Sequence, residues 1–203
     1  IKGITKAVRE QVRVVGSNRS DFDAYNNLPP DPGRLKLEDY GLLSSSGEGY
    51  ELWLTITKWI KGGENLAESL DKGEVPIQMY LEVLLKIGAC VHSTHEEGMA
   101  FTDLKPPNVI IVNGNPIIID PDTAKGFRSF LRVSRAGTKG FIAPEMSDPQ
   151  SVPASQRKVS AATDAYAFGG HVLEMVGVDW LEWEQEENTS RQDVFLLPFQ
   201  KQL

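Results

Sequence analysis

The spacing of apolar residues predicts a mixed chain in which short strands and helices alternate. An amphipathic helix is predicted over residues 4–15, where the apolar side chains at helical spacing are Ile4, Val8, Val12 and Val15. Residues 17–33 are polar and rich in proline, so they predict a loop. Two strands are expected after this loop, over residues 35–43 and 50–57, with a turn between them.

Helices are predicted on either side of the middle of the chain. Glu64 or Asn65 is placed to cap a short helix that ends near Leu70, and Pro76 suits the first turn of a longer helix that reaches about His95. A strongly apolar helix from about residue 162 to residue 176 is expected to be buried at the centre of the fold. Nothing in the pattern places residues 179–203.

A tight hairpin is predicted between these helices. Val109–Val112 and Pro116–Ile119 are short apolar runs, and the Asn113-Gly114-Asn115 sequence between them is a strong hairpin signal. A hairpin brings its two ends together. We therefore expect Asn108 and Asp120 to meet at one mouth of the hairpin.

The side chains around this hairpin suit phosphoryl transfer. Carboxylate and amide oxygens, as in Asp120 and Asn108, are the hard ligands that Mg²⁺ takes alongside phosphates. Lys105 can add positive charge, and Asp103 can accept a proton from an attacking hydroxyl. Either Asp taken alone is equally well explained as an ordinary turn residue. The joint pattern of Asp, Lys, Asn, hairpin and Asp favours a functional site.

Composition narrows the classes of function. The 203 residues carry a formal net charge of −7, which argues against nucleic-acid binding because that needs a basic surface. The single cysteine, Cys90, fits a reducing compartment and lies in an apolar helical stretch, where packing is its expected role. No apolar run approaches the ~20 residues of a membrane span and no signal peptide is visible, so a cytoplasmic protein without a membrane partner is expected. The first residue is Ile, which predicts a fragment or processed chain, and the oligomeric state stays open.

Several segments resemble, in the right order, the motifs of eukaryotic-type protein kinases. The stretch from Asp103 to Asp120 is similar to the catalytic and metal-binding loops of that family. The other matching segments are Leu54–Gly63 (last N-lobe strand and hinge), Thr94–Asp103 (approach to the catalytic loop), Ala136–Glu145 (end of the activation segment) and Asp164–Gly169 (start of the central helix).

The resemblance implies an α+β, protein-kinase-like, two-lobed fold. Residues 1–60 would form a partial N-lobe of one helix and antiparallel strands, and residues 61–203 would form the mainly helical C-lobe. Asp164 would be a structural carboxylate that accepts hydrogen bonds from the backbone of the catalytic loop. The implied activity is that of a serine/threonine protein kinase, which transfers the γ-phosphoryl group of ATP to a hydroxyl of a protein substrate.

The resemblance also assigns roles to residues of this chain. Asp103 would be the catalytic base, and Lys105 would contact the transferred phosphoryl group. Thr138 would bond to both of these residues and shape the acceptor site. Asn108 and Asp120 would hold Mg²⁺.

The ATP-binding residues are implied by the same comparison. Thr57 would be the gatekeeper, while the Lys58 carbonyl and the Ile60 N–H would face the adenine. Lys2 would be the phosphate-binding lysine and Glu10 its partner. The alternative for this last pair is a solvated Lys and a solvated Glu, as is common for such side chains.

Three departures from the family pattern keep a second function open. Thr102 stands where the family has Arg, so the usual partner of an activation-loop phosphate is missing, and activity is expected not to depend on that phosphorylation. Asp120-Pro121-Asp122 replaces Asp-Phe-Gly, which keeps the metal ligand and loses the aromatic ring and the flexible Gly. The sequence also contains no Gly-rich loop motif. A kinase-fold binding or scaffolding module without turnover is therefore the alternative to an enzyme, and a small-molecule kinase is a weaker third.

Overall fold

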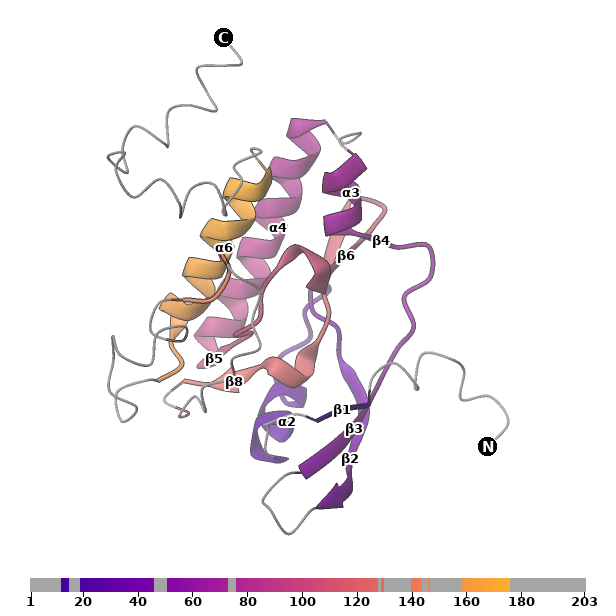
Figure 1. The fold of residues 1–203 in the computed structure, drawn as a ribbon, viewed down its shortest axis with the longest axis vertical. Coiled ribbons are helices and arrows are strands. Elements are labelled where there is room, and N and C mark those ends of the chain that lie inside the picture. The colour runs from indigo at the N-terminus through magenta and orange to yellow at the C-terminus, as the bar shows by residue number, and fades with distance from the viewer. Residues whose placement is uncertain are drawn as a thin grey trace.

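The structure is a computed structural model that describes residues 12–14, 19–45, 51–72, 76–127, 129, 140–143, 146 and 158–175. A three-stranded sheet and helix α2 lie at one end, and helices α4 and α6 pack side by side at the other (Figure 1). This is an α+β arrangement, as the sequence predicts. None of the described helices is both long and apolar enough to cross a membrane.

The sheet at the N-terminal end is antiparallel, with the strand order β1-β3-β2. Its strands are β1 (Val12–Val14), β2 (Leu37–Ser45) and β3 (Glu51–Thr57). The two predicted strands are thus confirmed as β2 and β3. The predicted helix over residues 4–15 is wrong at Val12–Val14, which pair with β3. β-branched residues favour a pleated strand, and the partner strand here overrides the helical spacing.

Helix α2 (Arg19–Asn26) corrects the predicted loop, which, among the residues that the structure describes, holds for residues 27–33. Two apolar side chains, Phe22 and Tyr25, are 1% and 3% exposed and dock the helix. The Phe22 ring packs on Tyr40 at 5.4 Å, and the Tyr25 hydroxyl donates to the Leu35 carbonyl at 2.9 Å. Two apolar residues in an otherwise polar helix give a weak periodic signal, which is why the spacing did not indicate it.

The helices that follow β3 in the chain begin close to the predicted positions. They are α3 (Leu66–Lys72), α4 (Ile77–Glu96) and α6 (Ala161–Met175). The Asn65 side-chain oxygen accepts from the Ala67 N–H at 3.0 Å, which confirms Asn65 as the cap of α3. Cys90 is buried in the core, and burial raises the pKa of its thiol to about 12, in agreement with a packing role.

His171 of α6 is fully buried beside the ring of Phe141, with the two ring centres 5.6 Å apart. Neither ring nitrogen has a hydrogen-bond partner among the described residues. Burial lowers the pKa of His171 to about 4; the nearby Leu104 backbone opposes this shift without reaching hydrogen-bond geometry.

The hairpin is confirmed as strands β6 (Val109–Val112) and β7 (Asn115–Ile118). Its turn residues Asn113 and Gly114 have φ values of 50° and 73°, the positive pair that a type I′ turn requires. The short strand β4 (Glu64–Asn65) completes this sheet in the order β4-β6-β7. Lys86 donates to the Gly114 carbonyl and to the Asn115 side chain, both at 2.9 Å, and so ties the turn to α4.

A two-stranded sheet, β5 (Met99–Ala100) with β8 (Lys125–Gly126), brackets the catalytic-loop region. Two single-turn 3₁₀ helices lie between these strands, η1 (Pro106–Asn108) and η2 (Pro121–Thr123). Lys125 also reaches α2, where its ammonium group lies 2.9 Å from the Asp21 carboxylate. This ion pair fixes α2 against the segment that follows the hairpin.

Candidate active site

Asp164 of α6 anchors the backbone of the loop that carries Asp103. The Asp164 carboxylate accepts from the N–H groups of Phe101 and Thr102 at 2.8 and 2.9 Å, and His95 contacts it at 2.9 Å. Asp164 is 0% exposed, so these contacts satisfy a carboxylate that has lost its water. The predicted structural role of Asp164 is confirmed.

Three of the predicted site residues meet at the end of this loop. The Lys105 ammonium lies 2.9 Å from the Asp103 carboxylate. The Asn108 amide donates to the same carboxylate oxygen at 3.1 Å and to the Asp103 backbone carbonyl at 2.9 Å. These contacts hold Asp103 in one orientation. They also use the donor end of the Asn108 amide, so its oxygen is the end left to accept or to coordinate.

Asp120 lies beside Asn108 because the hairpin closes there. The Ile119 N–H donates to the Asn108 carbonyl at 2.8 Å, one residue before Asp120. Asp120 itself has a φ of 75°, an uncommon backbone conformation for a non-glycine residue. The expectation that Asn108 and Asp120 meet at one mouth of the hairpin is confirmed.

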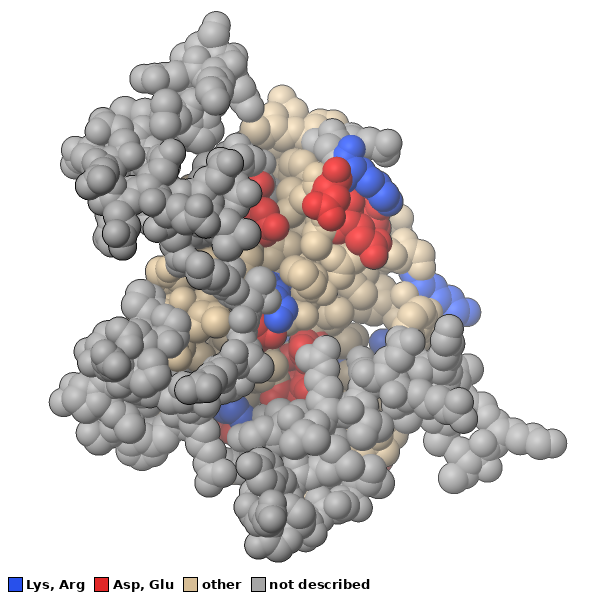
Figure 2. Space-filling view, in the orientation of Figure 1, with Lys and Arg blue, Asp and Glu red and all other residues tan. Residues whose placement is uncertain are grey.

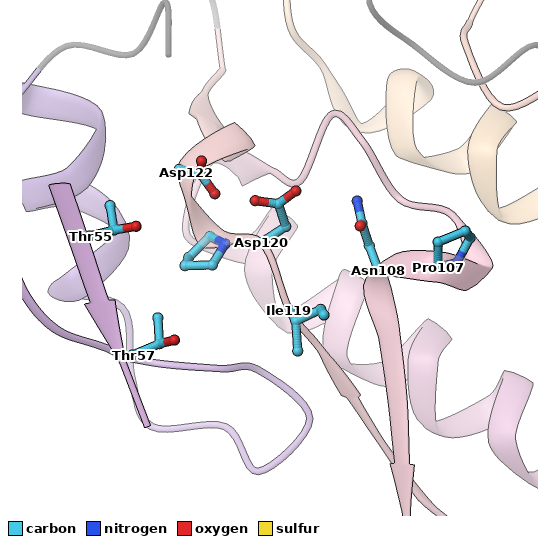
Figure 3. A pocket seen from close by; sticks show the side chains of 8 residues that line it. Thr55, Thr57, Pro107, Asn108, Ile119, Asp120 and Asp122 are labelled. Atoms are coloured by element: carbon cyan, nitrogen blue, oxygen red, sulfur yellow. The ribbon is translucent and has the colours of Figure 1, made fainter. Parts of the chain in front are cut away.

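A cavity of about 130 Å³ opens at this mouth. On one side of it lie Asn108, Asp120 and Asp122, and on the other lie Thr55 and Thr57 of β3 (Figure 3). Pro107, Ile119 and Pro121 complete the lining. Acidic and basic side chains also lie next to one another at the centre of the face in Figure 2, between the helices and the three-stranded sheet.

The predicted hinge residues differ in their position relative to this cavity, and their contact with adenine stays a prediction. Thr57 lines the cavity, while Lys58 and Ile60, on the segment after β3, do not. Thr55 lines it as well, two residues before Thr57 on the same face of the strand. That period-two spacing was visible in the sequence and could have indicated Thr55.

The remaining predicted site residues, Lys2, Glu10 and Thr138, lie outside the described residues. The helix assumed to carry Glu10 does not reach Val12, where β1 begins. The first described helix is α2, and its buried acid Asp21 pairs with Lys125.

A sequence model of the family described as protein kinase domain matches residues 42–200. The chain belongs to the protein kinase family. This match covers most of the 203 residues and includes β3, the hairpin and α6. Protein kinases use ATP and Mg²⁺ and act on protein substrates.

Curated relatives of this kinase domain are themselves named as protein kinases. A probable serine/threonine-protein kinase mps1 of Dictyostelium discoideum is 33% identical over 106 residues, covering 49% of this chain and 10% of that protein. The dual specificity protein kinase Ttk of Danio rerio is 28% identical over 167 residues, covering 77% of this chain and 16% of its own length. The serine/threonine-protein kinase PknA of Mycobacterium tuberculosis is 29% identical over 143 residues, covering 68% of this chain and 31% of PknA. The kinase domain thus aligns with less than a third of each of these relatives.

The oxygen donors that line the cavity of this kinase domain are of the kind that binds a magnesium ion. Asp120 offers a carboxylate and Asn108 an amide oxygen, and both face the cavity. Among the described residues, no group of three or more His, Cys, Asp or Glu side chains forms an alternative metal site. The suitability of the cavity for Mg²⁺ therefore rests on the Asp120 carboxylate and the Asn108 amide oxygen.

Contacts that sequence reasoning missed support the same region of the kinase domain. The Asp21–Lys125 ion pair fixes the segment that follows the cavity-lining residue Asp122. The Thr102 hydroxyl donates to the Thr123 carbonyl, and the Thr123 hydroxyl donates to the Phe101 carbonyl, so the catalytic loop and η2 are joined in both directions. No pattern in the sequence indicates these partners, because each pair joins residues that are 21 or more positions apart.

Proposed function

We propose that the chain is the catalytic domain of a serine/threonine protein kinase that transfers the ATP γ-phosphoryl group to a protein hydroxyl. The observation that carries this proposal is the contact of Lys105 and Asn108 with the carboxylate of Asp103, at 2.9 and 3.1 Å, beside the cavity that Asp120 lines. This constellation supplies a proton acceptor, a cation and oxygen ligands within one small volume. Positioning and charge stabilisation of this kind account for most of the catalysis in phosphoryl transfer.

Each side chain has a distinct task in this proposal. Asp103 orients the substrate hydroxyl and takes its proton, and Lys105 contacts the transferred phosphoryl group. Asn108 and Asp120 hold Mg²⁺, which neutralises charge on the nucleotide phosphates when it is bound. Thr57 and Thr55 bound the cavity on the side of β3. The protein substrate is the part of the activity that these residues do not specify.

The test is Mg²⁺-dependent ATP binding together with phosphate transfer to a generic protein substrate. We expect Asp103→Asn to lower kcat by about 100-fold or more while ATP still binds, because general base catalysis contributes about 10²–10⁴-fold. Asp120→Asn should remove the Mg²⁺ dependence of ATP binding. Glu82→Gln, an exposed carboxylate on α4, is the matched control and should change neither quantity. A near-normal rate for Asp103→Asn would sink the proposal.

A kinase-fold binding module without turnover is the second candidate. It is favoured by the Asp120-Pro121-Asp122 segment, in which Pro121 and Asp122 are both buried and replace a ring and a flexible glycine. The same measurements separate the two candidates. ATP binding without transfer in the wild-type chain would support the module.

A further inference from the structure

Two threonines exchange hydrogen bonds between the catalytic loop and the turn that follows Asp120. The Thr102 hydroxyl donates to the Thr123 carbonyl at 2.7 Å. In the opposite direction, the Thr123 hydroxyl lies 2.9 Å from the Phe101 carbonyl and 3.0 Å from the Asp120 carbonyl, and it shares its one proton between them. The catalytic loop and the turn that follows Asp120 meet through these two side chains, both of which are partly buried.

Thr102 keeps this contact at a conformational cost. Its φ is 62°, in the left-handed region, where a β-branched residue is a genuine outlier. Such a conformation persists only when the surrounding contacts over-determine it. The Thr102 N–H is held by Asp164 at 2.9 Å, and the hydroxyl is held by Thr123. The backbone immediately before Asp103 is therefore fixed from two sides.

Asp120 also has a left-handed backbone conformation, and the same pair of side chains holds it. Its φ is 75°, and its carbonyl accepts from the Thr123 hydroxyl. One side-chain pair thus restrains the residue before the candidate base and the candidate metal ligand together.

We propose that Thr102 and Thr123 are positioning residues. Together they form a clamp that fixes the position of Asp103 relative to Asp120. The proposal rests on the proposed kinase function for its catalytic consequence, although the clamp itself is a structural claim. The hydrogen bonds of the clamp join uncharged side chains to backbone carbonyls, so the clamp needs no phosphorylated group. This deepens the expectation from sequence that activity does not depend on a phosphate on the activation segment.

The experiment compares Thr102→Val with Thr102→Ser. Valine keeps the β-branched shape and removes the hydroxyl, whereas serine keeps the hydroxyl. The first readout is amide hydrogen exchange of residues 123–127, which needs no activity. Loss of one such bond should speed this exchange about tenfold in Thr102→Val, and Thr102→Ser should restore protection. The second readout is steady-state kinetics, where Thr102→Val should lower kcat about tenfold and leave the KM for ATP within about twofold.

Thr94→Val is the matched control. The Thr94 hydroxyl also makes two hydrogen bonds, to the Cys90 carbonyl and from Arg34, and neither partner lies in residues 101–103 or 120–123. Its loss should lower the thermal midpoint without changing exchange in residues 123–127 or kcat.

The possible outcomes separate the two proposals. Unchanged exchange in Thr102→Val overturns the clamp, and so does faster exchange with an unchanged kcat. Faster exchange with a lowered kcat, both rescued by serine, supports it. If the wild-type chain transfers no phosphate, the proposed function fails, and the exchange comparison still decides whether the hydroxyls join the two segments.

Discussion

The ion pair between Lys125 and Asp21 should carry a measurable part of the stability of the chain. The two charged groups lie 2.9 Å apart, with 16% and 10% of their side chains exposed. They are separated by 104 positions and join β8 to α2. We predict that Lys125→Met destabilises the fold strongly, because it leaves the Asp21 carboxylate buried without its cation.

The magnitude follows from the geometry. At an effective dielectric constant of about 20, two unit charges at this distance attract by about 6 kcal/mol, and removal of both groups from water offsets much of that gain. Removal of one partner from a buried pair typically costs about 3 kcal/mol, since the remaining charge stays desolvated. For a chain of this length, about 3 kcal/mol corresponds to a fall in the thermal midpoint of about 6–12 °C.

The assay is thermal or urea unfolding of Lys125→Met, Asp21→Asn and the double variant. The double variant should lose less stability than the sum of the single variants, with a coupling of at least about 1 kcal/mol. Lys72→Met is the matched control, because the Lys72–Glu64 pair is 55% and 45% exposed and is screened by solvent, so this variant should keep a thermal midpoint close to that of the wild type. A thermal midpoint for Lys125→Met within about 2 °C of the wild type would refute this reasoning, and so would strictly additive effects in the double variant.

Three further predictions concern stability. The pKa of His171 in the folded chain is about 4, below its ordinary value of 6.5. The neutral, buried His171 therefore contributes fully to the free energy of unfolding above pH 6.5, and this contribution is lost as the pH falls toward 4. Its size is on the order of 3 kcal/mol. His171→Leu should flatten unfolding free energy against pH in that window, and an unchanged pH profile would contradict this. Asn65→Ala should cost about 1 kcal/mol through loss of the α3 cap, measured by urea unfolding with Asn65→Asp as the control that keeps the acceptor. Gly63→Ala should cost about 1–3 kcal/mol, because the new Cβ would lie 2.2 Å from Ile110 Cγ2; an unchanged urea midpoint would show that Ile110 moves freely.

The half of the site built on the hairpin could be predicted from sequence because its signals are local. The Asn113-Gly114 turn specifies the pairing of β6 and β7, and that pairing alone brings Asn108 next to Asp120. The contacts of Lys105 and Asn108 with Asp103 likewise join residues within five positions of each other.

The part that sequence could not supply depends on distant partners. Val12–Val14 fits helical spacing and becomes a strand only because β3 lies beside it. Helix α2 carries too few large apolar residues to give a clear periodic signal. It is held by contacts with β8 and η2 and by the packing of Phe22 on Tyr40 of β2. The positive φ of Thr102 follows from bonds to Asp164 and Thr123, which no local pattern encodes.

The anchor from Asp164 makes the catalytic loop a late product of folding. The carboxylate that fixes the N–H groups of Phe101 and Thr102 lies 63 and 62 residues further along the chain. During synthesis, Asp103 and Asp120 leave the ribosome well before α6. The catalytic loop can therefore be fixed only after a long-range contact with α6 forms, and the entropic cost of closing that loop comes before the stabilising contacts. A nascent chain that stops before α6 would therefore carry every chemical group of the candidate site without its shape. Premature termination there would yield an inert polypeptide, however complete its motifs.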